Sequence, residues 1–372
     1  MRHRFATSIN RVTIKVGSSI LLKEDHDPDL TFIEELVRDI SVLSERDMEV
    51  VLVSSGAIGM GKRELGTGKN FDAIPSKQAL ASVGQIHLMN LYCQFFQQYH
   101  ISVGQVLLSA ADLSSRSSYL NARNTLLTLL RLKIIPVVNE NDTVAVEEIK
   151  FGDNDTLSAL VAGLVDADLL VILSDIKGVY SEDPRRNPKA KLIRKVSYIS
   201  EEMEETAQST SVEGRIGGMQ TKIKAAKIAT RSGIPVIIGG KDRDFLSQLF
   251  AGKEVGTLFL PQQNRLTSRK RWIAYGHFLK GKIVLDKGAK RALLQEGRSL
   301  LPSGVIEIKG KFDAGDSVSL LDEDNREFAR GITYYSSKEL KKIKGIKSHL
   351  IKPQLGYKYY DEVIHRDNLV IL

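Results

Sequence analysis

Apolar, β-branched runs alternate with stretches of helical periodicity along the first 240 residues. The runs typical of strands are 12–16, 49–55, 102–108, 134–140, 169–175 and 234–240. The stretches with helical spacing are 31–46, 76–99, 121–133, 153–167 and 217–233. Strands that are apolar throughout and alternate with helices are typical of a parallel sheet covered on both faces. The pattern therefore predicts an α/β fold, a three-layer αβα sandwich with a mainly parallel sheet.

From residue 279 onward the pattern changes to short strand-like segments separated by turns. Segments 310–318 and 321–329 combine apolar residues with turn-forming Gly, Asp and Asn, as is typical of small β domains. The preceding segment is charged and contains the sequence RKRWIAYG. We therefore predict an α/β domain over 1–260, a linker over 261–278 and a small, mainly β domain over 279–372.

Composition agrees with two folded domains and limits the chemistry. With 372 residues, 42% of them hydrophobic, the chain is long enough to bury more than one core. Cys93 is the only cysteine, which excludes an internal disulfide and a multi-cysteine metal site. We expect a cytoplasmic, reducing setting and a buried Cys93 side chain. The longest apolar stretch, 157–173, is interrupted by Asp166 and Asp168, so we predict no membrane partner.

The net charge of +8 is concentrated at the C-terminal end. Residues 261–372 hold 22 Lys and Arg against 13 Asp and Glu, so that part alone carries +9 and the rest of the chain −1. A basic excess confined to one domain suggests a polyanion such as RNA as its partner, although a solvated basic face is the commoner explanation.

Small and polar residues follow the predicted strands. Gly17, Ser55, the segment 139–142 and Ser174 each lie at the end of a strand-like run or directly after it. Ligands of parallel sheets bind beyond the carboxyl ends of the strands, and backbone N–H groups at helix starts attract phosphate. One of these places, GAIGMGKR (56–63), has Arg63 where a P-loop has a magnesium-binding Ser or Thr, so we interpret it as a strand-to-helix turn.

Two lysines are the cations best placed to act on a phosphoryl group. Lys15 lies inside the first strand-like run, so its ammonium must reach the strand end or be paired. Lys222 follows the paired glycines of GGMQTK near a helix start, where a cation opposes the helix dipole unless an anion is bound. Phosphoryl transfer depends on positioning and charge neutralisation, which two such lysines supply.

The segment FGDNDTLSA places Asp153 and Asp155 on either side of Asn154. Acidic side chains at this spacing repel one another unless a metal, an ammonium group or helix-start amides lie between them. We expect Asp155 to face inward, where it orients the lysines or Mg²⁺. Asp153 either joins the substrate site or caps the following helix.

Several motifs together resemble the glutamate 5-kinases, amino-acid-kinase-fold enzymes that open proline biosynthesis. They are KVGSS, SSGAIGMG, SKQALASVGQ, LNARNTL, PVVNENDTV, EIKFGDNDTLSALVA, SDIKGVY and GGMQTK, in order over residues 11–260. The resemblance implies that Lys15 and Lys222 flank the transferring phosphoryl group and that Ser55, Asp142 and Asn154 hold glutamate. The residues it implies for ATP are Lys15, Ser174, Asp175, Ile216, Gly217, Gly218, Met219, Gln220, Thr221 and Lys222.

The charged groups of glutamate indicate which side chain binds which part of the substrate. Its α-ammonium group requires carboxylates, for which we expect Asp142 and one of Asp153 and Asp155. Its α-carboxylate requires neutral donors, for which we expect Asn154 and Ser55. The γ-carboxylate then attacks the γ-phosphorus of Mg-ATP and gives an acyl phosphate and ADP. Because a carboxylate is already ionised near neutral pH, neither a protein nucleophile nor a general base is needed.

The C-terminal part resembles a PUA domain, a small pseudobarrel common in RNA-modifying enzymes and appended to many bacterial glutamate 5-kinases. The resemblance further implies proline as feedback inhibitor. We also predict a homo-oligomer, a dimer or a tetramer, and a glutamyl phosphate reductase as a partner, while direct hand-off of the acyl phosphate stays open. Two alternatives stay open: an RNA-binding or RNA-modifying protein that acts through the PUA domain, and an amino acid kinase with another acidic substrate. Acidic residues in the predicted cleft argue against a polyanion track there; they are Glu140, Asp142, Asp153, Asp155 and Asp175.

Overall fold

The computed structural model forms two compact units. It describes residues 9–66, 71, 73–109, 112–113, 116–144, 154–182, 184, 187, 189–201, 203–205, 218–240, 242, 244–261, 273–274 and 279–372, with the backbone alone at 116 and 117. The first unit comprises Met1–Asp112 and Ser117–Arg265, and the second comprises Leu113–Arg116 and Leu266–Leu372. The domain boundaries expected at 260 and 279 stay predictions.

The first unit is built on an eight-stranded sheet. Its order is β3 (Val103–Leu108), β4 (Ile135–Glu140), β2 (Glu49–Ser54), β1 (Arg11–Val16), β5 (Leu169–Leu173), β7 (Val236–Gly239), β8 (Thr257–Phe259) and β6 (Lys195–Val196). Every neighbouring pair is parallel except β7 with β8. The predicted α/β fold with a mainly parallel sheet is confirmed.

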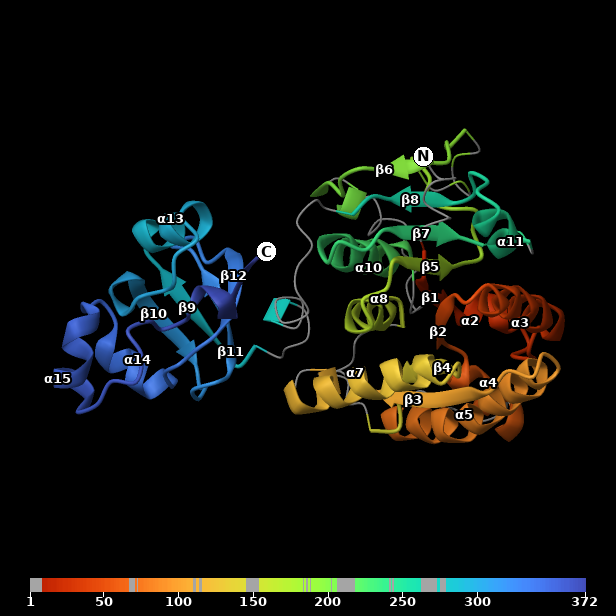
Figure 1. Cartoon of the computed structure of the whole chain (residues 1–372), viewed down its shortest axis with the longest axis horizontal. Helices are drawn as coiled ribbons and strands as arrows, with labels where there is room; N and C mark the ends of the chain where they lie inside the picture. Colours follow the sequence, from red (N-terminus) through yellow and green to blue (C-terminus); the bar gives the residue numbers. More distant parts are fainter. Residues whose placement is uncertain are drawn as a thin grey trace. The chain divides into compact units, whose positions relative to one another are not determined.

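Helices cover both faces of this sheet (Figure 1). One face carries α8 (Asn154–Leu164) and α10 (Met219–Arg231), and α7 (Arg116–Arg131) lies beside α8. The other face carries α3 (Leu30–Glu45), with α2 (Ser18–Leu21), α4 (Ala57–Leu65), α5 (Ile74–Gln97) and α11 (Phe245–Phe250). The three-layer αβα arrangement places the carboxyl ends of the parallel strands at one edge, where Lys15, Asp142 and Ser174 of the predicted site lie.

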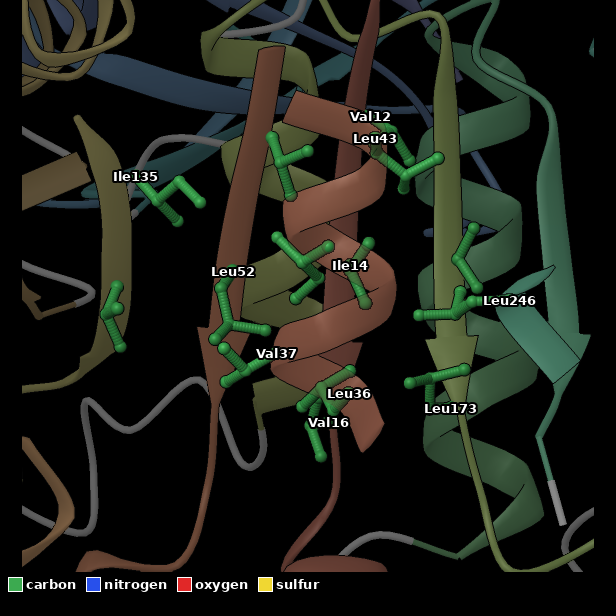
Figure 2. Packing of buried hydrophobic residues seen from close by; sticks show 14 of the residues in the cluster. Val12, Ile14, Val16, Leu36, Val37, Leu43, Leu52, Ile135, Leu173 and Leu246 are labelled. Carbon is green, nitrogen blue, oxygen red and sulfur yellow. The ribbon is translucent and has the colours of Figure 1, made fainter. Parts of the chain in front are cut away.

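Strand β1 shows how the core determines the direction of a functional side chain. Figure 2 shows Val12, Ile14 and Val16 packed towards α3, and none of the three has solvent-accessible surface. Successive side chains of a strand point to opposite faces of the sheet. Lys15 therefore points to the face covered by α8.

Helices α4 and α5 approach each other unusually closely. A Cβ atom on Gly84 would lie 1.8 Å from the carbonyl oxygen of Ala57, and one on Gly61 would lie 2.0 Å from that of Leu80. Gly56, which precedes α4, has a φ of 109°, a conformation that glycine adopts readily. The expected strand-to-helix turn is confirmed, and glycine at these positions fixes how α5 lies on α4.

The prediction that Cys93 is buried was wrong, because its side chain is exposed on α5. This helix has apolar residues around its circumference, so its sequence does not indicate which face is buried. The buried face includes Leu88, Tyr92 and Phe96. Within the described ranges, no helix is both long and apolar enough to cross a membrane.

The second unit has its own sheet and core. Its strand order is β10 (Val305–Gly310), β9 (Gly281–Leu285), β11 (Ser317–Leu321), β12 (Glu327–Ile332) and β13 (Leu369–Ile371). Its helices are α13 (Lys287–Gln295), α14 (Ser337–Ile343) and α15 (Ile351–Leu355), with short 3₁₀ turns at Pro302–Gly304, Ser348–Leu350 and Arg366–Asn368. Ile283, Leu320 and Tyr335 belong to a hydrophobic cluster of this unit alone. The prediction of a separate, mainly β domain is confirmed.

Candidate active site

One buried carboxylate joins the two predicted lysines. Lys15 Nζ lies 2.5 Å from Asp155 Oδ1, and Lys222 Nζ lies 3.3 Å from Asp155 Oδ2. The side chain of Asp155 is fully buried, while those of Lys15 and Lys222 are 5% and 9% exposed. The structure thus brings together three residues that the sequence places on β1, α8 and α10.

Local structure explains why these side chains converge. Lys15 extends to the carboxyl end of β1, where a Cβ atom on Gly17 would lie 3.5 Å from its Nζ. Asp155 is in the first turn of α8, where a helix dipole stabilises a negative charge. Lys222 is in the first turns of α10, which begins at Met219. Each residue reaches the site from a strand end or a helix start.

The electrostatics favour an ionised aspartate between two ammonium groups. Burial by itself would raise the pKa of Asp155, but the charges of Lys15 and Lys222 and hydrogen bonds from Lys15 and Thr221 outweigh it, so the pKa lies below its usual value. Two ammonium groups and one carboxylate leave one positive charge in a nearly water-free site. This arrangement can stabilise the charge of a phosphoryl group in transfer.

The start of α10 has the features of a phosphate-binding segment. Its N-cap residue, Gly218, has no side chain, and among the described residues no atom lies within 4 Å of where a Cβ would be. Thr221 Oγ1 lies 2.7 Å from Asp155 Oδ2 and 2.8 Å from the Gly218 carbonyl, which ties the helix start to Asp155. Free N–H groups at a helix start attract phosphate, and Lys222 adds a full charge there.

The other residues predicted to hold ATP are only partly described. Ser174 follows β5 and is buried, with its N–H donating to the Gly239 carbonyl at 2.8 Å and its hydroxyl to Asp175 at 3.1 Å. Asp175 is exposed. Because β5 pairs with β1 in parallel, these two residues share a sheet edge with Lys15. Met219 and Gln220 begin α10, whereas Ile216 and Gly217 lie outside the described residues.

Two of the predicted glutamate residues lie in contact. Asn154 Nδ2 is 3.0 Å from Ser55 Oγ and 3.2 Å from the carbonyl oxygen of Ser54. Asp142 is half-buried in the turn that follows β4, and β4 pairs with β2, the strand that leads to Ser55. Asp153 lies outside the described residues. Asn154, the neighbour of Asp155 in the chain, thus connects the residues predicted to hold glutamate with the lysine pair.

Sequence analysis missed the residues that support Asn154. Asn154 Nδ2 lies 2.8 Å from Asn139 Oδ1, and Asn139 Nδ2 in turn lies 2.8 Å from Gln85 Oε1. Tyr92 forms a 2.8 Å hydrogen bond with Ser54 Oγ. Burial raises the pKa of Tyr92, so its phenol stays neutral. Gln85 could have been found as a polar residue on the buried face of α5, but the sequence does not identify that face.

The described residues include no group of three or more His, Cys, Asp or Glu side chains arranged to hold a metal ion. Asp155, the most buried acidic side chain of the site, has both oxygens engaged by Lys15, Lys222 and Thr221. A divalent cation at this site would therefore need ligands from a bound nucleotide as well as from the protein.

Comparisons with known proteins agree with this geometry. Residues 10–240 match the model of the amino acid kinase family, and residues 281–355 match that of the PUA domain. A glutamate 5-kinase from Caldanaerobacter subterraneus subsp. tengcongensis is 49% identical over 97% of this chain and 98% of its own length. A glutamate 5-kinase from Syntrophotalea carbinolica is 48% identical over the whole of both chains.

Proposed function

Because the chain belongs to the amino acid kinase family, and within it to the glutamate 5-kinases, we propose that it transfers the γ-phosphoryl group of ATP to the γ-carboxylate of L-glutamate. The products are ADP and L-glutamyl 5-phosphate, and the reaction is the first step of proline biosynthesis. The observation that supports this best is the pair of buried lysines, Lys15 and Lys222, on one carboxylate.

In this proposal the lysines neutralise charge and Asp155 holds them in place. Lys15 and Lys222 stabilise the oxygens of the phosphoryl group as it moves from ADP to glutamate. Asp155 accepts from both ammonium groups and from Thr221, so it sets where the lysines lie before substrate binds. Such preorganisation is effective because the site excludes most water.

The nucleotide lies along the start of α10 and the end of β5. We assign Ser174, Asp175 and the segment 216–222 to ATP, with the N–H groups at Gly218 and Met219 directed to its phosphates. Gly218 at the N-cap of α10, with no described side chain capping this helix start, fits this role. Mg²⁺ arrives bound to ATP, whose phosphates supply ligands that this ion prefers.

Glutamate lies between the ends of β2 and β4 and the start of α8. We assign Ser55, Asp142, Asp153 and Asn154 to it, and the proximity of Asn154 to Ser55 supports this. The γ-carboxylate, already ionised at neutral pH, is the nucleophile. Its attack on the γ-phosphorus forms the new O–P bond while the bond to the ADP oxygen breaks, so no proton is transferred.

A hydroxamate assay tests the function directly. Hydroxylamine converts an acyl phosphate into a hydroxamate, which is measured as its coloured iron(III) complex. The purified chain with Mg-ATP and L-glutamate is therefore expected to give hydroxamate and ADP in equal amounts. L-Aspartate, one methylene shorter, is expected to give much less. Equal rates with aspartate, or ADP release without hydroxamate, would contradict the proposed substrate.

The second unit provides the remaining proposals. Its net positive charge makes RNA a candidate ligand for the PUA domain, and salt-dependent retention of RNA on a filter tests this. Proline inhibition, a homo-oligomer, transfer of the acyl phosphate to a reductase and a cytoplasmic location stay predictions from the sequence.

A further inference from the structure

A line of buried amide groups connects helix α5 to Asn154. Asn154 Nδ2 donates to Asn139 Oδ1, and Asn139 Nδ2 donates to Gln85 Oε1, each at 2.8 Å. Gln85 is 8% exposed and Asn139 is 2% exposed. Gln85 belongs to α5, Asn139 lies near the end of β4, and Asn154 begins α8. Three elements that are distant in sequence are thus linked to one residue of the proposed glutamate site.

Two backbone groups determine which way these amides face. The N–H of Glu140 donates to Asn139 Oδ1 at 2.8 Å, and because an N–H can only donate, the atom facing it must be the oxygen. The carbonyl of Ser54 accepts from Asn154 at 3.2 Å, and because a carbonyl can only accept, the atom facing it must be the nitrogen. The orientations therefore follow from the hydrogen bonds, although the two ends of an amide have nearly the same shape.

In this orientation both side-chain N–H groups of Asn154 donate to oxygens of the protein. Its Nδ2 has two hydrogens and faces three oxygens, from Ser54, Ser55 and Asn139, within 3.2 Å. Its Oδ1 is buried and finds no hydrogen-bond partner among the residues that the structure describes. A buried acceptor without a donor is costly. A ligand that brings an N–H group to Oδ1 removes this cost.

We propose that Gln85 and Asn139 are positioning residues that present Asn154 Oδ1 to the α-ammonium group of the substrate. This inference rests on the function proposed above and assigns one atom of that site. The sequence suggested Asn154 for the α-carboxylate, but the orientation directs its N–H groups to protein oxygens. The acceptor requires a hydrogen-bond donor on the substrate. It therefore selects glutamate over glutarate, the same dicarboxylate without the amino group.

Helix α5 is held firmly enough for this task. Tyr92, seven residues after Gln85 and so about two helical turns away on the same face, is fully buried and bonds to Ser54 Oγ at 2.8 Å. Gly84, next to Gln85, touches α4 so closely that a Cβ atom would meet the Ala57 carbonyl at 1.8 Å. Helix α5 thus supports both groups that orient Asn154, the end of β2 through Tyr92 and Asn139 through Gln85.

The first test is the Gln85→Leu variant. Leucine removes the acceptor for Asn139 Nδ2, so Asn139 and then Asn154 lose their fixed orientation. The KM for L-glutamate is expected to rise about tenfold, because the substrate loses roughly one hydrogen bond to the protein. The KM for ATP and kcat at saturating glutamate are expected to stay within about twofold. The ratio of kcat/KM for glutamate to that for glutarate is expected to fall.

Two matched variants separate this effect from a general loss of structure. Gln97→Leu makes the same change on the same helix at an exposed position, and it is expected to leave every constant unchanged. Asn139→Asp keeps an oxygen for Asn154, and Gln85 can turn to donate its Nε2, an atom with no partner among the described residues. Asn139→Asp is therefore expected to keep the preference for glutamate.

Calorimetry on the wild-type chain measures binding without any variant, so this test does not depend on whether the variants fold. L-Glutamate is expected to bind at least about tenfold more tightly than glutarate, and equal affinities would overturn the proposal. A Gln85→Leu variant that keeps the wild-type preference for glutamate over glutarate would overturn it too. So would a variant in which kcat falls and the KM values for glutamate and ATP rise to a similar extent. If the wild type bound glutamate selectively without phosphorylating it, the function proposed above would fail and this inference would stand.

Discussion

Lys15 and Lys222 approach opposite oxygens of the same buried carboxylate, that of Asp155. The first lysine belongs to a strand and the second to a helix more than 200 positions later in the chain. Because Asp155 has no exposed surface, its charge is compensated by these ammonium groups rather than by water. This relationship leads to predictions on stability, pH dependence and catalysis.

Replacing Asp155 by Asn removes the charge that the two lysines share. Breaking a buried ion pair by removing one partner typically costs about 3–5 kcal/mol, because the remaining charge is left uncompensated. We expect Asp155→Asn to lower the free energy of unfolding by an amount of this order, measured by urea denaturation at pH 7. Asp166→Asn, at a partly exposed pair with Arg123, serves as the control and is expected to cost less than about 1 kcal/mol.

The ionisation of Asp155 also predicts a pH dependence. Its pKa in the folded chain lies below the ordinary value of 3.8, so the unfolded chain takes up the proton first as the pH falls. The stabilisation from Asp155 is therefore complete above pH 3.8 and is lost as the pH falls through the pKa of the folded state. The difference in unfolding free energy between the wild type and Asp155→Asn is expected to be constant from pH 7 to about pH 5. It is expected to shrink below pH 3.8; a difference that grows there would contradict the assignment.

Gly84→Ala tests the contact that fixes α5 on α4. The added Cβ atom would lie 1.8 Å from the Ala57 carbonyl oxygen and 2.4 Å from the Gly61 nitrogen, so the two helices must move apart. Overpacking of this kind costs about 1–3 kcal/mol or more, and we expect a lower urea midpoint with an unchanged slope. Ser82→Ala, on the exposed side of the same helix, is expected to change the midpoint little. An unaltered midpoint for Gly84→Ala would show that the helices are not held at this distance.

The fold could be predicted from the sequence better than the side-chain hydrogen bonds within the site. Alternation of apolar strands and helices predicted the parallel sheet, and the rule for strand ends predicted that Lys15 and Ser55 share one edge with Ser174. The inward direction of Asp155 was also expected, and this residue is fully buried. These successes depend on local periodicity and on topology, both of which a single sequence carries.

The hydrogen bond between Asn139 and Gln85 could not be predicted because it joins two buried side chains that are 54 positions apart in the chain. The exposure of the Cys93 side chain could not be predicted either. Apolar residues lie on every side of helix α5, so its pattern does not show which residues face α4 and the sheet. The close contact at Gly84 shows which face of the helix meets α4, and such a contact is visible only in three dimensions.

The most direct test of the account is the turnover of Lys222→Ala beside that of Lys224→Ala. The side chain of Lys222 is 9% exposed and bound to Asp155, whereas Lys224 lies exposed on the same helix. If Lys222 stabilises the transferring phosphoryl group, its loss is expected to lower kcat in the hydroxamate assay by about 10²–10³-fold or more. Lys224→Ala is expected to retain wild-type turnover. A folded Lys222→Ala variant with kcat close to that of the wild type would contradict the central claim.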